Sequence, residues 1–235
     1  MSERKLLGVL GGMGPMSSVF FYELLTENTD ASCDQEHVDM LLSSRATIPD
    51  RTDYILGLSE DNPLPAMLEE TKRLTDAGCT TIAMTCNTAH YFYEALQAST
   101  DVPILNIGRL AVEEIERHGI KKVGLMATTG TVKTGIYQTA CEEKGIECIY
   151  PDENDQKTVM SIIYSQVKAG KKVDMNAFKA VSDRLIERGA EILILGCTEL
   201  SVIRRTESLG EEYIDPLLIL ARECIVSCDR KLKED

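Results

Sequence analysis

The sequence lacks the features of a secreted, membrane-bound or nucleic-acid-binding protein. No apolar run approaches the ~18 residues of a membrane span, and the amino terminus leads into an apolar stretch too short for a secretory signal. The net charge of −13 argues against binding to a phosphate backbone, which needs a basic face. Eight cysteines without a secretion signal favour reduced thiols in a cytoplasm. We therefore expect a cytoplasmic protein with no nucleic-acid or membrane partner.

The sequence also lacks the spacings that bind metals and nucleotides. Its three histidines stand far apart, without cysteine pairs at zinc-site spacing. The glycine-rich stretch 11–14 is followed by serine at position 17, where a dinucleotide fingerprint needs its third glycine, and by no Lys-Ser/Thr pair as in a P-loop. We expect neither a metal nor a cofactor. The backbone N–H groups of this turn and the hydroxyls of Ser17 and Ser18 suit a carboxylate instead.

Two cysteines stand in matching frames. Gly78 is followed after eight residues by Cys86, and Gly189 after eight residues by Cys197. In each frame an amphipathic helix ends at the glycine, a short apolar strand follows, and the cysteine comes where that strand ends. The chain is therefore predicted to contain one unit twice.

A second unit is duplicated upstream of each frame. The apolar stretches 5–10 and 122–126 both lead into a loop that contains glycine. Apolar strands that alternate with amphipathic helices predict an α/β fold of two pseudo-symmetric domains, each a mostly parallel sheet flanked by helices. We place residues 1–106 and 208–235 in the first domain and residues 107–207 in the second. Ligands of such sheets bind at the carboxyl ends of the strands, so we expect the site in the cleft between the domains.

The cysteine pair has a structural and a functional interpretation. A single free cysteine is most often a small buried residue. Both cysteines here are followed at once by polar residues, Asn87 and Thr88 after the first and Thr198 after the second. Helices that begin there would place each sulfur near a helix amino terminus, which favours the thiolate. Two thiols on opposite sides of one carbon can remove a proton from one face and return it on the other.

Three further residues have competing interpretations. His90, four residues after Cys86, is either a base in a cysteine–histidine pair or, as we favour, a helix-face residue that orients the loop. Arg51 follows a strand predicted at 40–46; a surface arginine is the default, but its planar fork suits a carboxylate. Lys168 ends a predicted helix, where the helix dipole favours lysine in any case.

Together these motifs resemble those of the aspartate/glutamate racemase family, whose members racemise amino acids without a cofactor. The motifs that carry the resemblance extend over essentially the whole chain and are Gly11-Gly12-Met13-Gly14-Pro15, Asp34-Gln35-Glu36-His37, Ile48-Pro49-Asp50-Arg51-Thr52, Cys86-Asn87-Thr88-Ala89-His90, Ala127-Thr128-Thr129-Gly130-Thr131 and Gly196-Cys197-Thr198-Glu199. The resemblance implies two pseudo-symmetric α/β domains with the active site between them, and usually a homodimer.

The resemblance also implies roles for individual residues. The two acid/base thiols would be Cys86 and Cys197. Arg51 matches the arginine that holds the side-chain carboxylate in aspartate-acting members, and Lys168 lies, by a looser alignment, where a second carboxylate-binding lysine is expected. The full set of implied substrate-binding residues is Met13, Arg51, Asn87, Thr88, Thr128, Lys168 and Thr198. Glutamate racemases carry Asp-Ser-Gly-x-Gly in the amino-terminal loop, whereas this chain has Gly-Gly-Met-Gly-Pro, so aspartate is favoured.

The favoured function is therefore cofactor-independent racemisation of an acidic amino acid, most of all L-/D-aspartate, by two-base proton transfer between Cys86 and Cys197. A glutamate or broad-specificity racemase, or a two-cysteine isomerase or decarboxylase of small dicarboxylates, would use the same thiols. A cysteine–histidine acyl-transfer enzyme would use Cys86 with His90 and would not need Cys197. A two-lobed carboxylate-binding protein would explain the cleft and Arg51, but not two framed thiols.

Overall fold

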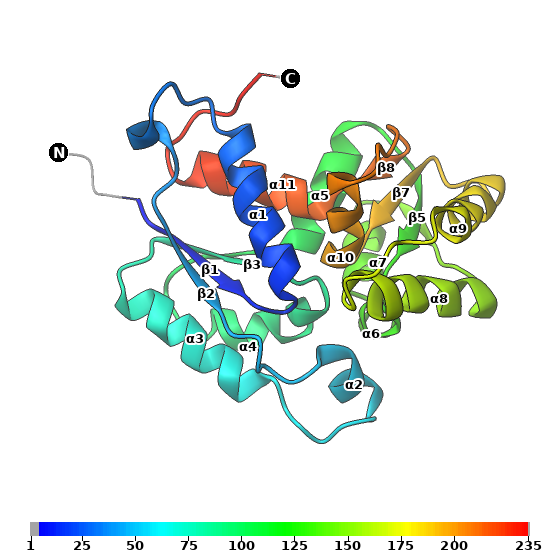
Figure 1. The fold of residues 1–235 in the computed structure, drawn as a ribbon, viewed down its shortest axis with the longest axis horizontal. Helices are drawn as coiled ribbons and strands as arrows, with labels where there is room; N and C mark the ends of the chain where they lie inside the picture. The colour runs from blue at the N-terminus through cyan, green and yellow to red at the C-terminus, as the bar shows by residue number, and fades with distance from the viewer. Residues whose placement is uncertain (1–4, 235) are drawn as a thin grey trace.

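The computed structural model of the protein describes residues 5–234 and contains two four-stranded sheets (Figure 1). The strand order is β2-β1-β3-β4 in the first sheet and β6-β5-β7-β8 in the second, and all neighbouring strands are parallel. The strands are β1 (Leu7–Gly11), β2 (Met40–Ser44), β3 (Thr81–Met84), β4 (Ile104–Leu105), β5 (Lys122–Met126), β6 (Glu147–Ile149), β7 (Ile192–Leu195) and β8 (Tyr213–Ile214). Each strand has an equivalent in the other half, which confirms the predicted α/β fold with two pseudo-symmetric parallel sheets.

Helices alternate with the strands in both halves. Those between β1 and β4 are α1 (Pro15–Asn28), η1 (Asp34–Glu36), α2 (Arg51–Leu56), α3 (Leu64–Asp76), η2 (Thr88–Phe92) and α4 (Tyr93–Gln97). Those after β4 are α5 (Ile107–Arg117), α6 (Thr129–Thr134), α7 (Ile136–Glu143), α8 (Glu153–Met160), the π-helical η3 (Ser161–Val167), α9 (Met175–Glu187), α10 (Thr198–Val202), η4 (Ile203–Arg205) and α11 (Pro216–Ser227). None of the helices within residues 5–234 has the length and apolar character that a membrane crossing requires.

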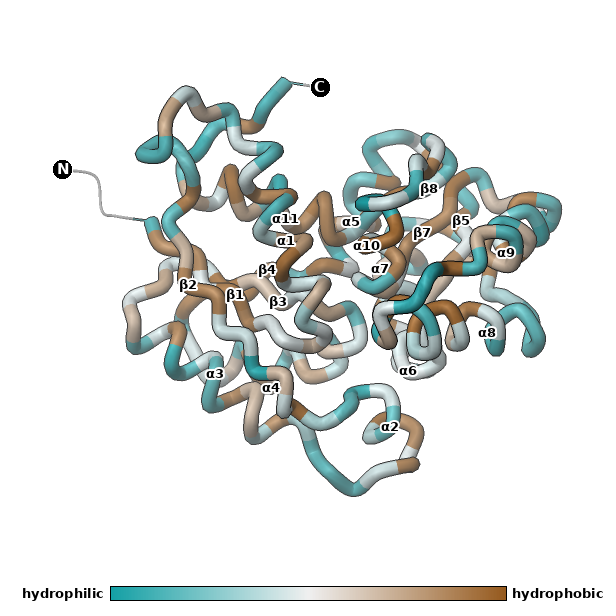
Figure 2. The backbone as a smooth tube through the Cα atoms, viewed as in Figure 1, coloured by the Kyte–Doolittle hydropathy of each residue, from teal (hydrophilic) through white to brown (hydrophobic). Residues whose placement is uncertain are grey.

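Both faces of each sheet are covered, which explains why the strands read as unbroken apolar runs. In β1, Leu7 and Val9 pack into a core cluster with α1 and α11, whereas Leu10 packs on the opposite face with α3. The same alternation places Leu193 of β7 against α8 and α9 and Ile194 against α5 and α7. Figure 2 shows the apolar stretches concentrated on the interior strands and on α11.

The two halves exchange their last helices. Helix α5 follows β4 of the first sheet, yet it packs with β5 of the second. Helix α11 follows β8 of the second sheet, yet it packs with α1 and β1 of the first (Figure 1). The domain limits at residues 106 and 207 stay a prediction. Because β8 pairs with β7, we propose that the second crossing lies at Asp215 rather than at residue 207.

Candidate active site

The two framed cysteines follow equivalent strands and lie in segments that contact each other. Cys86 comes two residues after β3 and Cys197 two residues after β7, and their exposed fractions are 6% and 5%. The hydroxyl of Thr198, next to Cys197, donates a hydrogen bond of 3.2 Å to the carbonyl oxygen of Thr85, next to Cys86. This contact joins the carboxyl edges of the two sheets, so the structure brings the two thiol-bearing segments together.

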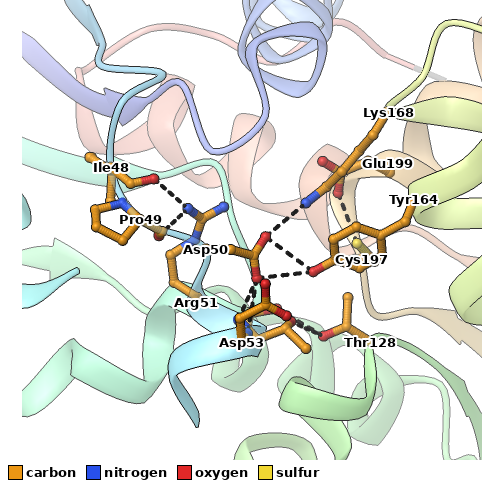
Figure 3. Close-up of polar contacts among 12 residues, drawn as sticks. Ile48, Pro49, Asp50, Arg51, Asp53, Thr128, Tyr164, Lys168, Cys197 and Glu199 are labelled. Carbon is orange, nitrogen blue, oxygen red and sulfur yellow. Dashed lines mark hydrogen bonds and ion pairs between the residues drawn. The ribbon is translucent and has the colours of Figure 1, made fainter. Parts of the chain in front are cut away.

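Cys197 lies beside a carboxylate. Its Sγ donates a hydrogen bond of 2.8 Å to Oε2 of Glu199, which is itself buried (Figure 3). Burial and the neighbouring carboxylate raise the pKa of Cys197 well above its usual range, and Lys168 opposes this rise only in part. The expectation that a helix amino terminus lowers the pKa of this thiol is therefore wrong, because α10 is short and its second residue is Glu199. At neutral pH Cys197 carries its proton.

Cys86 lies beside a cation. The guanidinium of Arg51 is 6% exposed, and its Nη1 donates to the carbonyl oxygens of Ile48 and Pro49 at 3.1 and 2.7 Å. Burial alone would lower the pKa of Arg51, but Cys86 and Asp50 beside it outweigh burial and raise that pKa. Arg51 is therefore a permanent buried cation, and its Nε has no hydrogen-bond partner among the described residues.

A second cation reaches the same region from the other half. Lys168 Nζ lies 3.5 Å from Asp50 Oδ2 and 4.1 Å from the centre of the Tyr164 ring, and the Tyr164 hydroxyl donates to both oxygens of Asp50 (Figure 3). Burial opposes ionisation of Asp50, yet Lys168 and the hydrogen bonds to Asp50 hold its pKa below the usual value. Asp50 also accepts from the backbone N–H groups of Thr52 and Asp53 as the cap of α2. The ion pair thus fixes the Arg51 loop against the second half.

Buried hydroxyl groups form a further contact between the halves. The Thr88 hydroxyl lies 3.1 Å from that of Thr128 and 2.8 Å from that of Thr131, and Thr52 donates to Thr128 at 3.3 Å. These threonines come from η2, α2 and the start of α6. The network places two of the predicted substrate-binding residues, Thr88 and Thr128, in direct contact.

His90 does not point its ring at the thiol. Its Nδ1 lies 2.9 Å from the backbone oxygen of Cys86, and its Nε2 accepts from the N–H of Ile107 at 3.2 Å. The proton is therefore on Nδ1. Burial lowers the pKa of His90, so the ring stays neutral. This agrees with the interpretation that His90 orients the loop, and it disfavours a cysteine–histidine nucleophile pair.

A cavity of about 480 Å³ adjoins these groups. Its lining residues are Gly12, Met13, Gly14, Pro15, Met16, Ser17, Ala46, Ile48, Asp50, Arg51, Val167, Lys168 and Glu199. Neither cysteine is among them, but Arg51 connects the cavity to Cys86 and Glu199 connects it to Cys197. Four buried polar atoms nearby have no hydrogen-bond partner among the described residues: Ser17 Oγ, Arg51 Nε, Asn87 Nδ2 and Glu199 Oε1. Unpaired buried polar atoms are costly, and a small polar ligand would satisfy them.

The structure thus gathers Met13, Arg51 and Lys168 at one cavity, and it adds residues that the sequence had not assigned. Glu199 stands two positions after Cys197 in the Gly196-Cys197-Thr198-Glu199 motif, so the sequence could have indicated that it lies near this thiol. Tyr164 precedes Lys168 by four residues, which is one helical turn. The sequence did not indicate a role for Tyr137, because its hydrogen-bond partner Asn87 is 50 residues away in the chain. No group of three or more His, Cys, Asp or Glu within residues 5–234 is arranged to hold a metal ion.

Comparison with known proteins gives a consistent result. The family described as Asp/Glu/Hydantoin racemase matches residues 10–224. A broad-specificity amino-acid racemase from Bacillus subtilis is 29% identical over 224 residues, which cover 94% of this chain and 96% of that protein. The structure of an aspartate racemase from Picrophilus torridus superposes with a TM-score of 0.82 at 33% identity, covering 97% of this chain and 96% of that one. Glutamate racemase from Francisella tularensis shares the fold, with a TM-score of 0.67 at 19% identity over 95% of this chain and 80% of that one.

Proposed function

The chain belongs to the Asp/Glu/Hydantoin racemase family, and we propose that it interconverts L- and D-aspartate by proton transfer between Cys86 and Cys197. The family predicted from the sequence is confirmed, and the protein is an enzyme of the amino-acid racemase type. The observation that carries the proposal is the pair of buried thiols at the ends of equivalent strands, in segments joined by the Thr198–Thr85 hydrogen bond.

Arg51 supports aspartate as the substrate. Its Nη1 donates to two backbone carbonyl groups and its Nε has no partner among the described residues, so we propose that Nε and the adjacent Nη2 form a fork for a carboxylate. Lys168 is a second cation at the same cavity. Burial would lower the pKa of Lys168, but Glu199, Tyr164, Cys197 and Asp50 raise it, so the ammonium stays charged. Two cations suit a dicarboxylic amino acid better than a neutral one.

The surroundings of the two sulfurs differ, and this difference supports the order of proton transfers that we propose. Cys197 faces a carboxylate, which raises its pKa, and it carries the proton, whereas Cys86 lies beside the cation of Arg51 and is the base that we propose for the first step. Cys86 forms its S–H bond with the α proton of the substrate, and the C–H electron pair remains on the α-carbon. Cys197 then gives its proton to the opposite face, which leaves Cys86 protonated and Cys197 as the thiolate. The two sulfurs share one proton and exchange roles when the reaction runs in the reverse direction.

The intermediate carbanion must be stabilised within the site. Buried donors at the α-carboxylate stabilise the charge that develops there, because they act where water is excluded. Asn87, with its unpaired Nδ2, and the hydroxyls of Thr88 and Thr128 are the groups proposed for this role. Each proton transfer is assigned to a side chain of this chain, so the reaction we propose needs no cofactor.

A second candidate is racemisation of a broader set of amino acids. It is favoured by the similarity to the Bacillus subtilis broad-specificity racemase, which extends over nearly the whole length of both proteins. The two candidates differ in the dependence on a second carboxylate. Aspartate racemisation requires the cation of Arg51 to face the substrate side chain, whereas broad specificity does not.

Chiral chromatography of purified protein, dialysed against EDTA, tests the proposal directly. The protein should interconvert L- and D-aspartate without added pyridoxal phosphate, and both Cys86→Ser and Cys197→Ser should abolish the interconversion. In deuterated water each variant should still exchange the α proton of only one enantiomer, and the two variants should prefer opposite enantiomers. Near-normal racemisation by Cys197→Ser would refute the two-base mechanism. Activity that appears only with pyridoxal phosphate would refute the cofactor-independent reaction.

The homodimer and the cytoplasmic location expected from the sequence stay predictions. The native mass of the purified protein, measured by light scattering, tests the first of them, and fractionation of the source cells tests the second.

A further inference from the structure

Tyr137 connects the second half of the molecule to the residue that follows Cys86. It lies on α7 with an exposed fraction of 0%, and its hydroxyl donates a hydrogen bond of 2.5 Å to Oδ1 of Asn87. Asn87 is 1% exposed and belongs to the first half. The hydroxyl of Tyr137 therefore forms a hydrogen bond with one amide oxygen across the boundary between the halves.

This hydrogen bond fixes which way the Asn87 amide faces. Burial and the nearby Asp215 raise the pKa of Tyr137 well above 10, so its hydroxyl keeps its proton and remains a donor. An amide has one acceptor and one donor end, and Asn87 uses the acceptor end on Tyr137. Its Nδ2 must then face away from the tyrosine. That nitrogen is buried and has no hydrogen-bond partner among residues 5–234.

We propose that Tyr137 is a positioning residue that locks the Asn87 amide so that its NH₂ group donates to the α-carboxylate of the substrate. A carboxylate only accepts hydrogen bonds, so a flipped amide would present an oxygen to an oxygen. The α-carboxylate is attached to the carbon that Cys86 must reach, and Asn87 is the next residue in the chain. The side-chain carboxylate is assigned to Arg51. This inference rests on the proposed function, because it takes aspartate as the ligand.

Tyr137→Phe removes one hydroxyl and keeps the ring, so it tests the lock with little change in packing. Calorimetric titration with L-aspartate and with β-alanine separates the two carboxylates, because β-alanine keeps the amine and the side-chain carboxylate and lacks the α-carboxylate. We expect the variant to bind aspartate about tenfold more weakly, the effect of one net hydrogen bond, and β-alanine as the parent does. Tyr150→Phe is the matched control, since its hydroxyl faces Gln138 on the outside of the same half.

Equal loss of affinity for both ligands would mean a purely structural role and would overturn the proposal, as would unchanged aspartate binding. Asn87→Asp tests the same polarity with Tyr137 intact and covers the case in which Tyr137→Phe does not fold. The new carboxylate still accepts from Tyr137 but offers an oxygen to the substrate, so aspartate binding should fall and β-alanine binding should not. Aspartate binding as in the parent would overturn the proposal. If the parent neither binds nor racemises aspartate, the proposed function fails instead.

Discussion

The sharpest test of substrate choice is Arg51→Lys. The substitution keeps a positive charge in the buried site, but it replaces the planar fork of Arg51 by a single ammonium group. In the structure Nη1 donates to the carbonyl oxygens of Ile48 and Pro49, and Nε has no partner among the described residues; we propose that Nε and Nη2 hold the carboxylate. A lysine ammonium cannot serve all four acceptors in that geometry. We expect it to lose one of the two charge-assisted hydrogen bonds to the substrate.

A hydrogen bond to a charged group contributes ~1.5–3 kcal/mol. Because each 1.36 kcal/mol corresponds to a tenfold change in rate, kcat/KM for aspartate should fall by roughly 10- to 150-fold. The assay is chiral chromatography of initial rates with L-aspartate and with L-alanine, together with thermal unfolding to confirm that the loop stays folded. Alanine should be a poor substrate for the parent, and its kcat/KM should change much less.

The alanine measurement separates two roles of Arg51. The guanidinium faces Cys86 as well as the cavity, so a loss through Cys86 would reduce both substrates equally. A loss through the side-chain carboxylate reduces aspartate alone. Equal reductions, or normal aspartate racemisation by Arg51→Ala in a folded protein, would refute the assignment of Arg51 as the carboxylate anchor.

Three further predictions test other contacts. Burial and the Glu199 carboxylate raise the pKa of Cys197, so Glu199→Gln should shift the pH midpoint of Cys197 alkylation to a lower value. Mass spectrometry of the alkylated protein measures this midpoint. An unshifted midpoint would contradict the contact between Cys197 and Glu199. A Cβ at Gly130 would lie 3.0 Å from the backbone of a threonine in α2, so Gly130→Ala should lower the free energy of unfolding in urea by ~1–3 kcal/mol. The control Gly108→Ala has room for the new methyl group and should raise the free energy of unfolding by up to about 1 kcal/mol. Equal changes in the two variants would contradict the close approach of α2 and α6. Burial lowers the pKa of His90, so unfolding takes up a proton below about pH 6.5 and the free energy of unfolding falls as the pH drops below that value. The variant His90→Gln should lose less of its free energy of unfolding over the same pH interval. An identical pH dependence of unfolding in the variant and the parent would contradict a neutral buried ring.

The repeated architecture could be predicted from the sequence because its signals are local. The glycines at 78 and 189 both adopt positive φ at the end of a helix, and the strands that follow are buried on both faces. The strand order in each half was not predicted, because right-handed crossovers limit the possible orders without choosing one of them. The position of β8 was not predicted, because a strand of two residues carries almost no periodic signal.

The site was predictable only where a motif marked it. Framed cysteines and Arg51 stand in recognisable segments, whereas Tyr137 and Tyr164 act through contacts between residues far apart in the chain. Charge environment was the weakest point. Helix position alone suggests a lowered pKa for Cys197, but burial and the carboxylate of Glu199 outweigh the dipole of a five-residue helix. Such competition between neighbours is settled by side-chain positions, which spacing does not give.

The two halves are built alike, yet their thiols have opposite neighbours, and this difference bears on turnover. In the mechanism that we propose, one turnover leaves the thiolate on Cys197, where it faces the negative charge of Glu199. Lys168 is the cation that lowers the pKa of Cys197 there and offsets part of that repulsion. In this mechanism the proton must then return from Cys86 to Cys197 before the same enantiomer can bind productively again. Duplication supplies two equivalent thiol positions, and their charged neighbours differ: Arg51 lies beside Cys86, and Glu199 and Lys168 lie beside Cys197.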